Sequence, residues 1–172
     1  MRVAVGSDHA GFDLKEILKA ELAALDHDVT DLGTHDAVTS VDYPDYGAAV
    51  GRRVATGAAD LGICVCGSGN GIAMAANKVP GIRAAVVHDV TTAALAGQHN
   101  HANVVCFGAR TTGTTVAIDA LHAFLAATRE TPERNSRHLR RIEKLAALDE
   151  AAGPGADAER ELVHHTAPEG MT

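Results

Sequence analysis

The sequence predicts an α/β fold, a three-layer sandwich in which helices cover both faces of a five-stranded parallel sheet. Short apolar runs typical of strands alternate with longer helical patterns along the first 150 residues. This alternation is typical of a parallel sheet with crossover helices. One apolar run ends in a glycine-rich turn that leads directly into a helix, as expected at the carboxyl edge of such a sheet. The expected architecture is therefore Rossmann-like.

The expected elements follow one another in regular order. The strands are expected at residues 2–6, 28–32, 60–65, 82–87 and 103–107. The helices are expected at residues 11–25, 44–56, 72–77, 90–97, 113–128 and 132–149. The last helix has a clear start signal, because Thr131 is a good cap and Pro132 suits the first helical position.

The composition divides the chain into one domain and a tail. Residues 1–150 are enough for a single domain with its own core. Residues 151–172 are rich in glycine and proline and have no apolar periodicity. We expect this tail to be disordered.

Charge and composition exclude several classes of partner. The chain has 15 basic and 22 acidic residues, no tryptophan and only five tyrosines and phenylalanines. This balance disfavours nucleic acid and an anionic membrane as partners. Three cysteines, no leader-like apolar segment and no membrane-length apolar run predict a cytoplasmic protein. An anionic substrate would therefore need a local cluster of arginines.

The segment Leu61–Asn77 carries the strongest chemical signal. It runs from an apolar strand through Cys66 into the turn 67–71 and then into a helix. Backbone N–H groups of such a turn can hold an anion, and their position favours the thiolate of a cysteine. Alternatively, Cys64 and Cys66 point the same way from the strand and both could fill the core. We expect Cys66 to be functional, and Cys64 and Cys106 to be core residues.

Other polar residues are expected at the ends of strands or on one helix face. Asp8 either caps the first helix or contacts a ligand, and His9 beside that helix start is suited to phosphate. Arg110 follows the fifth strand, at the edge where such sheets bind ligands. Arg137 and Arg141 are four residues apart, so they share a helix face. They either clamp a phosphate or belong to a solvated basic face.

Nucleotide and metal motifs do not fit. The glycines of the turn 67–71 are spaced G-x-G-x-G, whereas a dinucleotide site needs G-x-G-x-x-G. Gly6 and Gly11 have the spacing of a P-loop, but Lys and Ser or Thr do not follow them. Cys64 and Cys66 lack the usual two-residue gap of a zinc site. We expect neither a cofactor nor a metal.

His99 lies in the segment 98–101, expected to be a loop between a helix and the fifth strand. Such a loop is at the amino edge of the sheet, about 17 Å from the edge where Cys66 ends its strand. If both residues act on one substrate, they must come from different subunits. We expect His101 in the same loop to be exposed.

Taken together, these motifs resemble ribose-5-phosphate isomerase type B, a family that also contains the galactose-6-phosphate isomerase subunits. The resemblance covers residues 1–148. It rests on Ser7-Asp8-His9-Ala10-Gly11, Asp42-Tyr43-Pro44, Cys66-Gly67-Ser68-Gly69-Asn70-Gly71, Ala76-Asn77-Lys78, Gln98-His99-Asn100 and Arg137-His138-x-x-Arg141.

The resemblance implies a role for each matching residue. It implies that Cys66 is the base, that His99 helps to open the sugar ring, and that Ser68 binds the enediolate. It implies further contacts to the enediolate by the backbone of Gly67, Gly69, Asn70 and Gly71, to sugar hydroxyls by Asp8, Tyr43 and Asn100, and to phosphate by His9, Arg110, Arg137 and Arg141. Some relatives use a glutamate as the base at the position of Ile72.

The resemblance predicts an enzyme that interconverts ribose 5-phosphate and ribulose 5-phosphate in the pentose phosphate pathway. It also implies a homodimer or a dimer of dimers with shared active sites. This chemistry needs a base and preorganised donors, but no cofactor. An isomerase of six-carbon phosphates such as allose or galactose 6-phosphate is one alternative. A non-catalytic sugar-phosphate-binding module is another, although such a module would not need Cys66.

Overall fold

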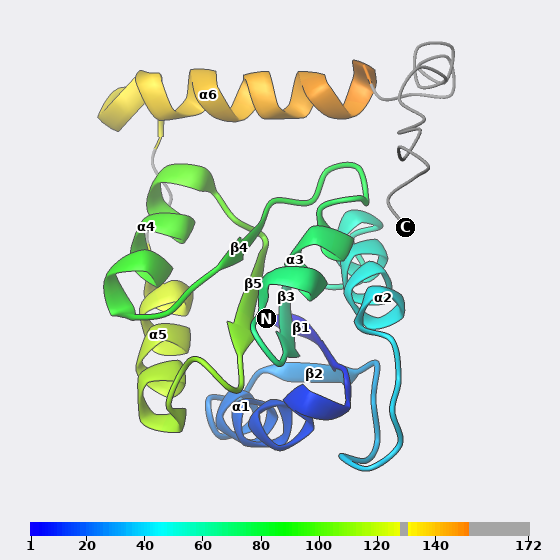
Figure 1. Ribbon diagram of the computed structural model, residues 1–172. Coiled ribbons are helices and arrows are strands. Elements are labelled where there is room, and N and C mark those ends of the chain that lie inside the picture. The colour runs from blue at the N-terminus through cyan, green and yellow to red at the C-terminus, as the bar shows by residue number, and fades with distance from the viewer. Residues whose placement is uncertain (128–130, 152–172) are drawn as a thin grey trace, which may run out of the picture.

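The computed structural model describes residues 1–127 and 131–151, and within them one parallel sheet lies between two layers of helices (Figure 1). The strands are β1 (Arg2–Ser7), β2 (Asp28–Asp31), β3 (Leu61–Cys66), β4 (Ala84–Val86) and β5 (Val104–Gly108). The helical elements are the 3-10 turn η1 (His9–Gly11), α1 (Phe12–Ala24), α2 (Tyr43–Ala55), α3 (Asn70–Ala76), α4 (Val90–Asn100), α5 (Thr114–Ala126) and α6 (Pro132–Ala151).

The sheet confirms the predicted fold class. Its strand order is β2-β1-β3-β5-β4, and every neighbouring pair is parallel. The chain moves from β1 outward to β2 and then returns to the other side of β1 to form β3. The strand order therefore reverses between β1 and β3, and ligands of open α/β sheets bind in the crevice at such a point.

Each face of the sheet has its own core. The side chains of α1, α4 and α5 pack against one face, where Leu18 of α1, Leu121 of α5 and Phe107 of β5 are fully buried. The side chains of α2 and α3 pack against the other face, around Val50 and Ile72. The alternation of the strand side chains between these two clusters explains why the strands read as continuous apolar runs.

The end of α4 differs from the prediction. Gly97 was expected to end this helix, but it lies inside α4, where an added Cβ would be 2.5 Å from the Cβ of Ala127. The glycine thus allows α4 and α5 to approach closely and does not stop the helix. His101 ends α4 instead, in a left-handed conformation with φ 46°. His99 consequently lies in the last helical turn, and His101 is half-buried rather than exposed.

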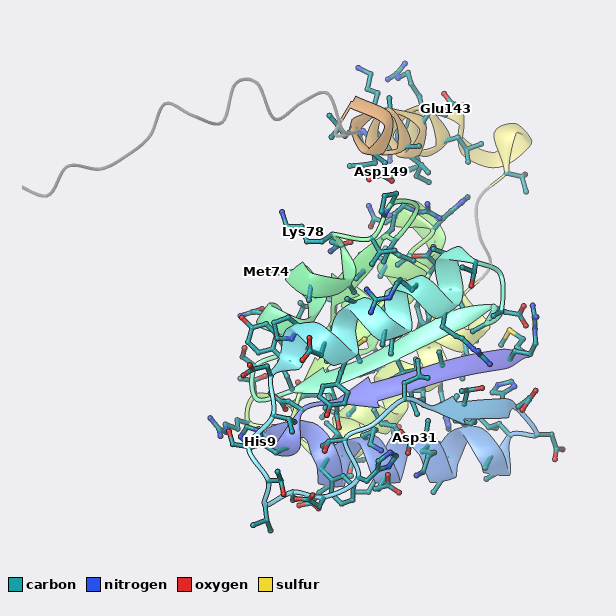
Figure 2. All side chains as sticks on the ribbon, turned by 90° about the vertical axis from the view of Figure 1, so that its right-hand side faces the viewer. His9, Asp31, Met74, Lys78, Glu143 and Asp149 are labelled. Carbon is teal, nitrogen blue, oxygen red and sulfur yellow. The ribbon has the colours of Figure 1, made fainter. Side chains whose placement is uncertain are left out.

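Helix α6 lies apart from both layers. It crosses the domain beyond the β4 edge of the sheet, and it contacts α4 (Figures 1 and 2). Asp149 holds its far end, because its carboxylate accepts a hydrogen bond of 2.8 Å from the N–H of Gly81. Among the α6 side chains that the structure describes, only His138 is buried.

An ion network joins α1 to the end of β2. The Lys15 side chain is 1% exposed, and its Nζ lies 2.7 Å from carboxylate oxygens of Asp31 and Glu16. Lys19 also contacts Asp31, at 2.8 Å. Asp31 in turn accepts a hydrogen bond from the N–H of Gly33, whose carbonyl accepts one from the N–H of Ser7. The network therefore holds the segment after β2 against the end of β1, directly before Asp8.

No helix in residues 1–127 and 131–151 is long and apolar enough to cross a membrane. The prediction for the tail concerns residues that, apart from Ala151, lie outside the described part of the chain.

Candidate active site

A pocket of about 330 Å³ opens at the carboxyl edge of the sheet, over the crevice between β1 and β3. In Figure 2 this is the end of the sheet toward which the strand arrows point, near the labelled His9. The pocket is lined by Asp8, Tyr43, Cys66, Gly67, Ser68, Gly71, Arg110 and Thr111. Seven of these eight residues were predicted from the sequence as site residues.

Cys66 ends β3 and lines this pocket. Cys66 is 4% exposed, and its Sγ accepts a hydrogen bond of 3.1 Å from the N–H of Gly69. Gly69 can turn this N–H back toward the sulfur because its φ is +79°, a conformation that side chains disfavour. An amide donor aimed at the sulfur is the environment that a thiolate needs. Because α3 has only seven residues, this amide matters more than the dipole of the whole helix.

The other two cysteines are core residues, as predicted. Cys64 and Cys106 face each other across β3 and β5 and have no exposed surface. Burial, followed by the contact with Cys64, raises the pKa of the Cys106 thiol well above its usual value. Ile72 is also fully buried, so it contributes only packing beside the turn. Cys66 is thus the one cysteine that lines the pocket.

Asp8 both caps a helical turn and lines the pocket. Its Oδ1 accepts a hydrogen bond of 2.9 Å from the N–H of Gly11, and the residue is 6% exposed. His9 is half-buried next to it, and its Nδ1 accepts a hydrogen bond of 3.2 Å from the N–H of Val41. His9 thereby fastens the loop that leads into α2 and Tyr43.

Tyr43 lies beside the last glycine of the turn, Gly71, and Arg110 beside the first, Gly67. A Cβ at Gly71 would lie 2.6 Å from Cζ of Tyr43, so only glycine leaves room for the ring. The Arg110 side chain lies 3.6 Å from the corresponding position at Gly67. The Arg110 N–H also donates a 2.9 Å hydrogen bond to the Gly67 carbonyl. Arg110 is exposed and offers its guanidinium to an anion in the pocket.

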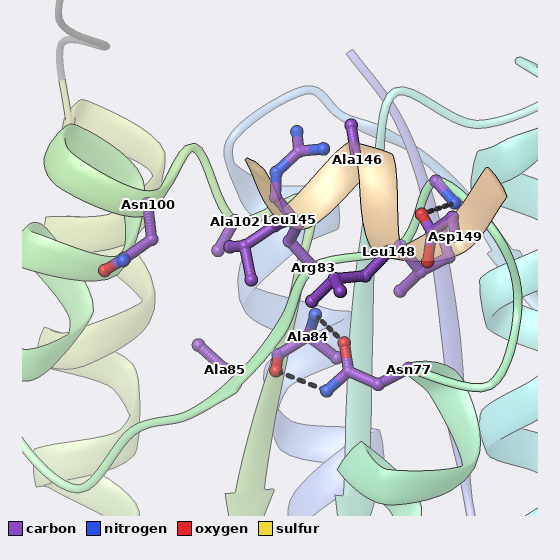
Figure 3. A pocket seen from close by; sticks show the side chains of 12 residues that line it. Asn77, Arg83, Ala84, Ala85, Asn100, Ala102, Leu145, Ala146, Leu148 and Asp149 are labelled. Carbon is purple, nitrogen blue, oxygen red and sulfur yellow. Dashed lines mark hydrogen bonds between the residues drawn. The ribbon is translucent and has the colours of Figure 1, made fainter. Parts of the chain in front are cut away.

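Asn70 begins α3 within the glycine turn, whereas four other predicted residues, His99, Asn100, Arg137 and Arg141, form a second cluster on α4 and α6 at the opposite edge of the sheet. The rings of His99 and His138 are stacked, with centroids 4.2 Å apart and an interplanar angle of 14°. Arg137 precedes His138 on α6, and Arg141 is exposed one turn further along. Asn100 lines a different pocket of about 440 Å³, which lies between α6 and the segment 81–85 (Figure 3).

The pairing of β3 with β5 shows how far apart the two clusters lie along the strands. Cys66 pairs with Gly108, whereas the first residue of β5, Val104, pairs with Gly62. These four steps correspond to about 13 Å along the strands, and His99 precedes Val104 by a further five residues. His99 and Cys66 of one chain therefore lie at opposite edges, as the sequence predicted.

Comparison with known proteins identifies the family of this chain. The sequence model of the family described as ribose/galactose isomerase matches residues 3–145. The chain belongs to this family. It is 40% identical over 149 residues to ribose-5-phosphate isomerase B of Escherichia coli, which covers 87% of this chain and 97% of that protein.

Other members of the ribose/galactose isomerase family are equally similar. Galactose-6-phosphate isomerase subunit LacB of Clostridium acetobutylicum is also 40% identical, over 87% of this chain and 86% of that protein. The crystal structure of ribose-5-phosphate isomerase B from Mycoplasma genitalium with bound ribulose-5-phosphate superposes with a TM-score of 0.81 at 39% identity. It covers 87% of this chain and 96% of that one.

Sequence reasoning assigned no role to two residues beside these clusters. Thr111 lines the pocket next to Arg110, and its position after the fifth strand was the available signal. His138 belongs to the quoted family motif, but its contact with His99 spans 39 residues and has no periodicity that could reveal it. Within residues 1–127 and 131–151, no three His, Cys, Asp or Glu side chains come together as metal ligands would.

Proposed function

We propose that this chain is an aldose-ketose isomerase that interconverts ribose 5-phosphate and ribulose 5-phosphate. The observation that carries the proposal is the Cys66 thiol on the pocket wall, with the Gly69 N–H donating to its sulfur at 3.1 Å. A protein that only bound sugar phosphates would need the arginines but no base. The Mycoplasma genitalium relative with bound ribulose-5-phosphate supports the same substrate class.

In the proposed reaction, Cys66 moves one proton between two carbons. The thiolate removes the proton from C2 of the open-chain aldose, and the electron pair shifts to O1 to give an enediolate. The resulting thiol returns the proton to C1, while the hydroxyl proton at O2 passes to O1. Ser68 and the backbone N–H groups of the turn 67–71 stabilise the negative charge on the enediolate oxygens.

The substrate contacts follow from the two clusters. At the Cys66 pocket, which is the first cluster, Asp8 and Tyr43 bind sugar hydroxyls, and Arg110 and His9 hold the phosphate. In the second, Asn100 binds a hydroxyl and His99 assists ring opening, while Arg137 and Arg141 complete the phosphate site. A dianionic phosphate accounts for exposed arginines on a chain whose net charge is -7.

The proposal requires a dimer, because the two clusters lie at opposite edges of each sheet. A two-fold axis would bring His99 of one chain to the Cys66 pocket of the other, so that each dimer has two shared sites. Leu145 and Leu148 of α6 are 46% and 65% exposed, and they offer an apolar surface to a second chain. A dimer of dimers would leave these shared sites unchanged.

We also propose that the enzyme works in the cytoplasm. Its three cysteines are free, and a reducing compartment keeps the Cys66 thiol available for proton transfer.

A direct assay tests the function. The purified chain is incubated with ribose 5-phosphate, and ribulose 5-phosphate is followed by a coupled reaction. Allose 6-phosphate and galactose 6-phosphate are compared at equal concentration, because the Clostridium acetobutylicum subunit is as similar as the Escherichia coli enzyme. We expect the highest kcat/KM with ribose 5-phosphate. A preference for a six-carbon substrate would change the assignment, and binding without turnover would indicate a sugar-phosphate-binding module.

A further inference from the structure

The His138 ring lies between two residues that the proposed function uses. It stacks on His99 at 4.2 Å between centroids, and its Nε2 lies 3.2 Å from Nε of Arg137. We propose that His138 is a positioning residue that couples the phosphate-binding Arg137 to the orientation of the His99 ring. This inference rests on the proposed function, in which Arg137 binds phosphate and His99 opens the sugar ring.

The hydrogen bond with Arg137 has a fixed direction. A guanidinium is always a donor, so Nε2 of His138 must be the acceptor and carries no proton. The bond uses only the Nε–H of Arg137, and its two terminal NH₂ groups remain suited to bidentate contact with a phosphate.

The stacking restricts His99. With an interplanar angle of 14° and centroids 4.2 Å apart, rotation about the Cβ–Cγ bond of His99 would tilt its ring into the face of His138. His138 is 7% exposed, so its own position is fixed by packing. A ring held in this way presents the same nitrogen to each sugar that arrives, which is the preorganisation that efficient proton transfer needs.

Two substitutions separate the two contacts. His138→Phe keeps a flat ring against His99 but removes the acceptor for Arg137. We expect it to retain kcat within about threefold and to raise KM. His138→Ala removes both contacts, and we expect kcat to fall about tenfold or more, since small displacements of a reacting group are costly.

Asp149→Ala is the matched control for the packing of α6. Asp149 fastens the far end of the helix to Gly81, and it lies 11 residues after His138, about 16 Å along α6. Its loss therefore loosens α6 without removing either of the stacked rings. We expect Asp149→Ala to keep the wild-type kcat. If it lowers kcat as much as His138→Ala does, docking of α6 alone explains the effect and the inference is wrong. A wild-type kcat in His138→Ala would also overturn it, as would an equal loss in His138→Phe.

A double substitution tests whether His138 acts through His99. We expect His99→Ala and His99→Ala/His138→Ala to have the same kcat, because His138 has nothing left to orient. If the two fold-losses multiply, His138 acts independently and the inference is overturned.

A measurement on the unliganded protein separates this inference from the proposed function. The NMR signal of the His99 Cε1–H should be single and sharp in the wild type and in His138→Phe, but broadened or split in His138→Ala. A wild type that does not convert ribose 5-phosphate would contradict the proposed function alone. An unchanged, sharp signal in His138→Ala would contradict the ordering of His99 by His138.

Discussion

Replacing Gly71 by alanine should displace the Tyr43 ring from the pocket while the fold stays intact. The new Cβ would lie 2.6 Å from Cζ of Tyr43, so the ring must retreat by about 1 Å to reach an ordinary contact distance. Tyr43 is 41% exposed at the start of α2, and its ring can swing toward solvent without opening the core. A displacement of this size can cost up to about 100-fold. We expect kcat/KM to fall about 10- to 100-fold, mainly through KM.

The thermal stability of Gly71→Ala should not fall with its kcat/KM. Alanine is favoured over glycine inside a helix by about 0.5–1 kcal/mol, so Tm should stay constant or rise. The assay combines steady-state kinetics on ribose 5-phosphate with thermal unfolding. Gly113→Ala is the matched control, because Gly113 has φ -65° and no atom within 4 Å of an added Cβ. Equal kcat/KM values for the two variants would refute the contact between Tyr43 and substrate.

Two further predictions concern Cys66 and the ion network. Cys66→Ala should lower kcat by about 100-fold or more at nearly unchanged KM, because the base is lost and the phosphate contacts remain. Steady-state kinetics measure both constants, and a wild-type kcat in this variant would exclude Cys66 as the base. Burial opposes ionisation of Asp31, but hydrogen bonds from Lys15 and Lys19 outweigh it and lower its pKa from 3.8 to about 2. A lowered pKa in the folded state stabilises the protein above about pH 4, and this contribution is lost as the pH falls toward 2. Urea unfolding should therefore show a steeper loss of stability over this interval in the wild type than in Asp31→Asn, and equal slopes would contradict the coupling.

The sequence allowed the sheet and its carboxyl edge to be predicted because both depend on local signals. Continuous apolar runs mark strands that are buried on both faces, and Cys66 with its glycine turn marks the place where β3 ends. The residues at these strand ends then meet because parallel strands share one edge. This is why seven predicted residues line a single pocket.

Other features depend on contacts that local patterns do not encode. Glycine often marks the end of a helix, but Gly97 lies inside α4. A glycine is needed there because Ala127, at the end of α5, leaves no room for a side chain. The partner of His138 is His99, and the chain between them passes through β5 and α5 before α6 brings the rings together. Tertiary packing decided both cases.

The central claim is that one active site combines Cys66 of one chain with His99 of another. Cys66→Ala and His99→Ala chains should each keep only a small residual activity alone, since every site in either homodimer lacks one of the two groups. After subunit exchange at equal amounts, about half of the dimers are mixed and each contains one intact site, so roughly a quarter of the wild-type activity should return. Native mass spectrometry verifies the exchange. Activity that stays at the residual level of the single variants after confirmed exchange would contradict the shared site.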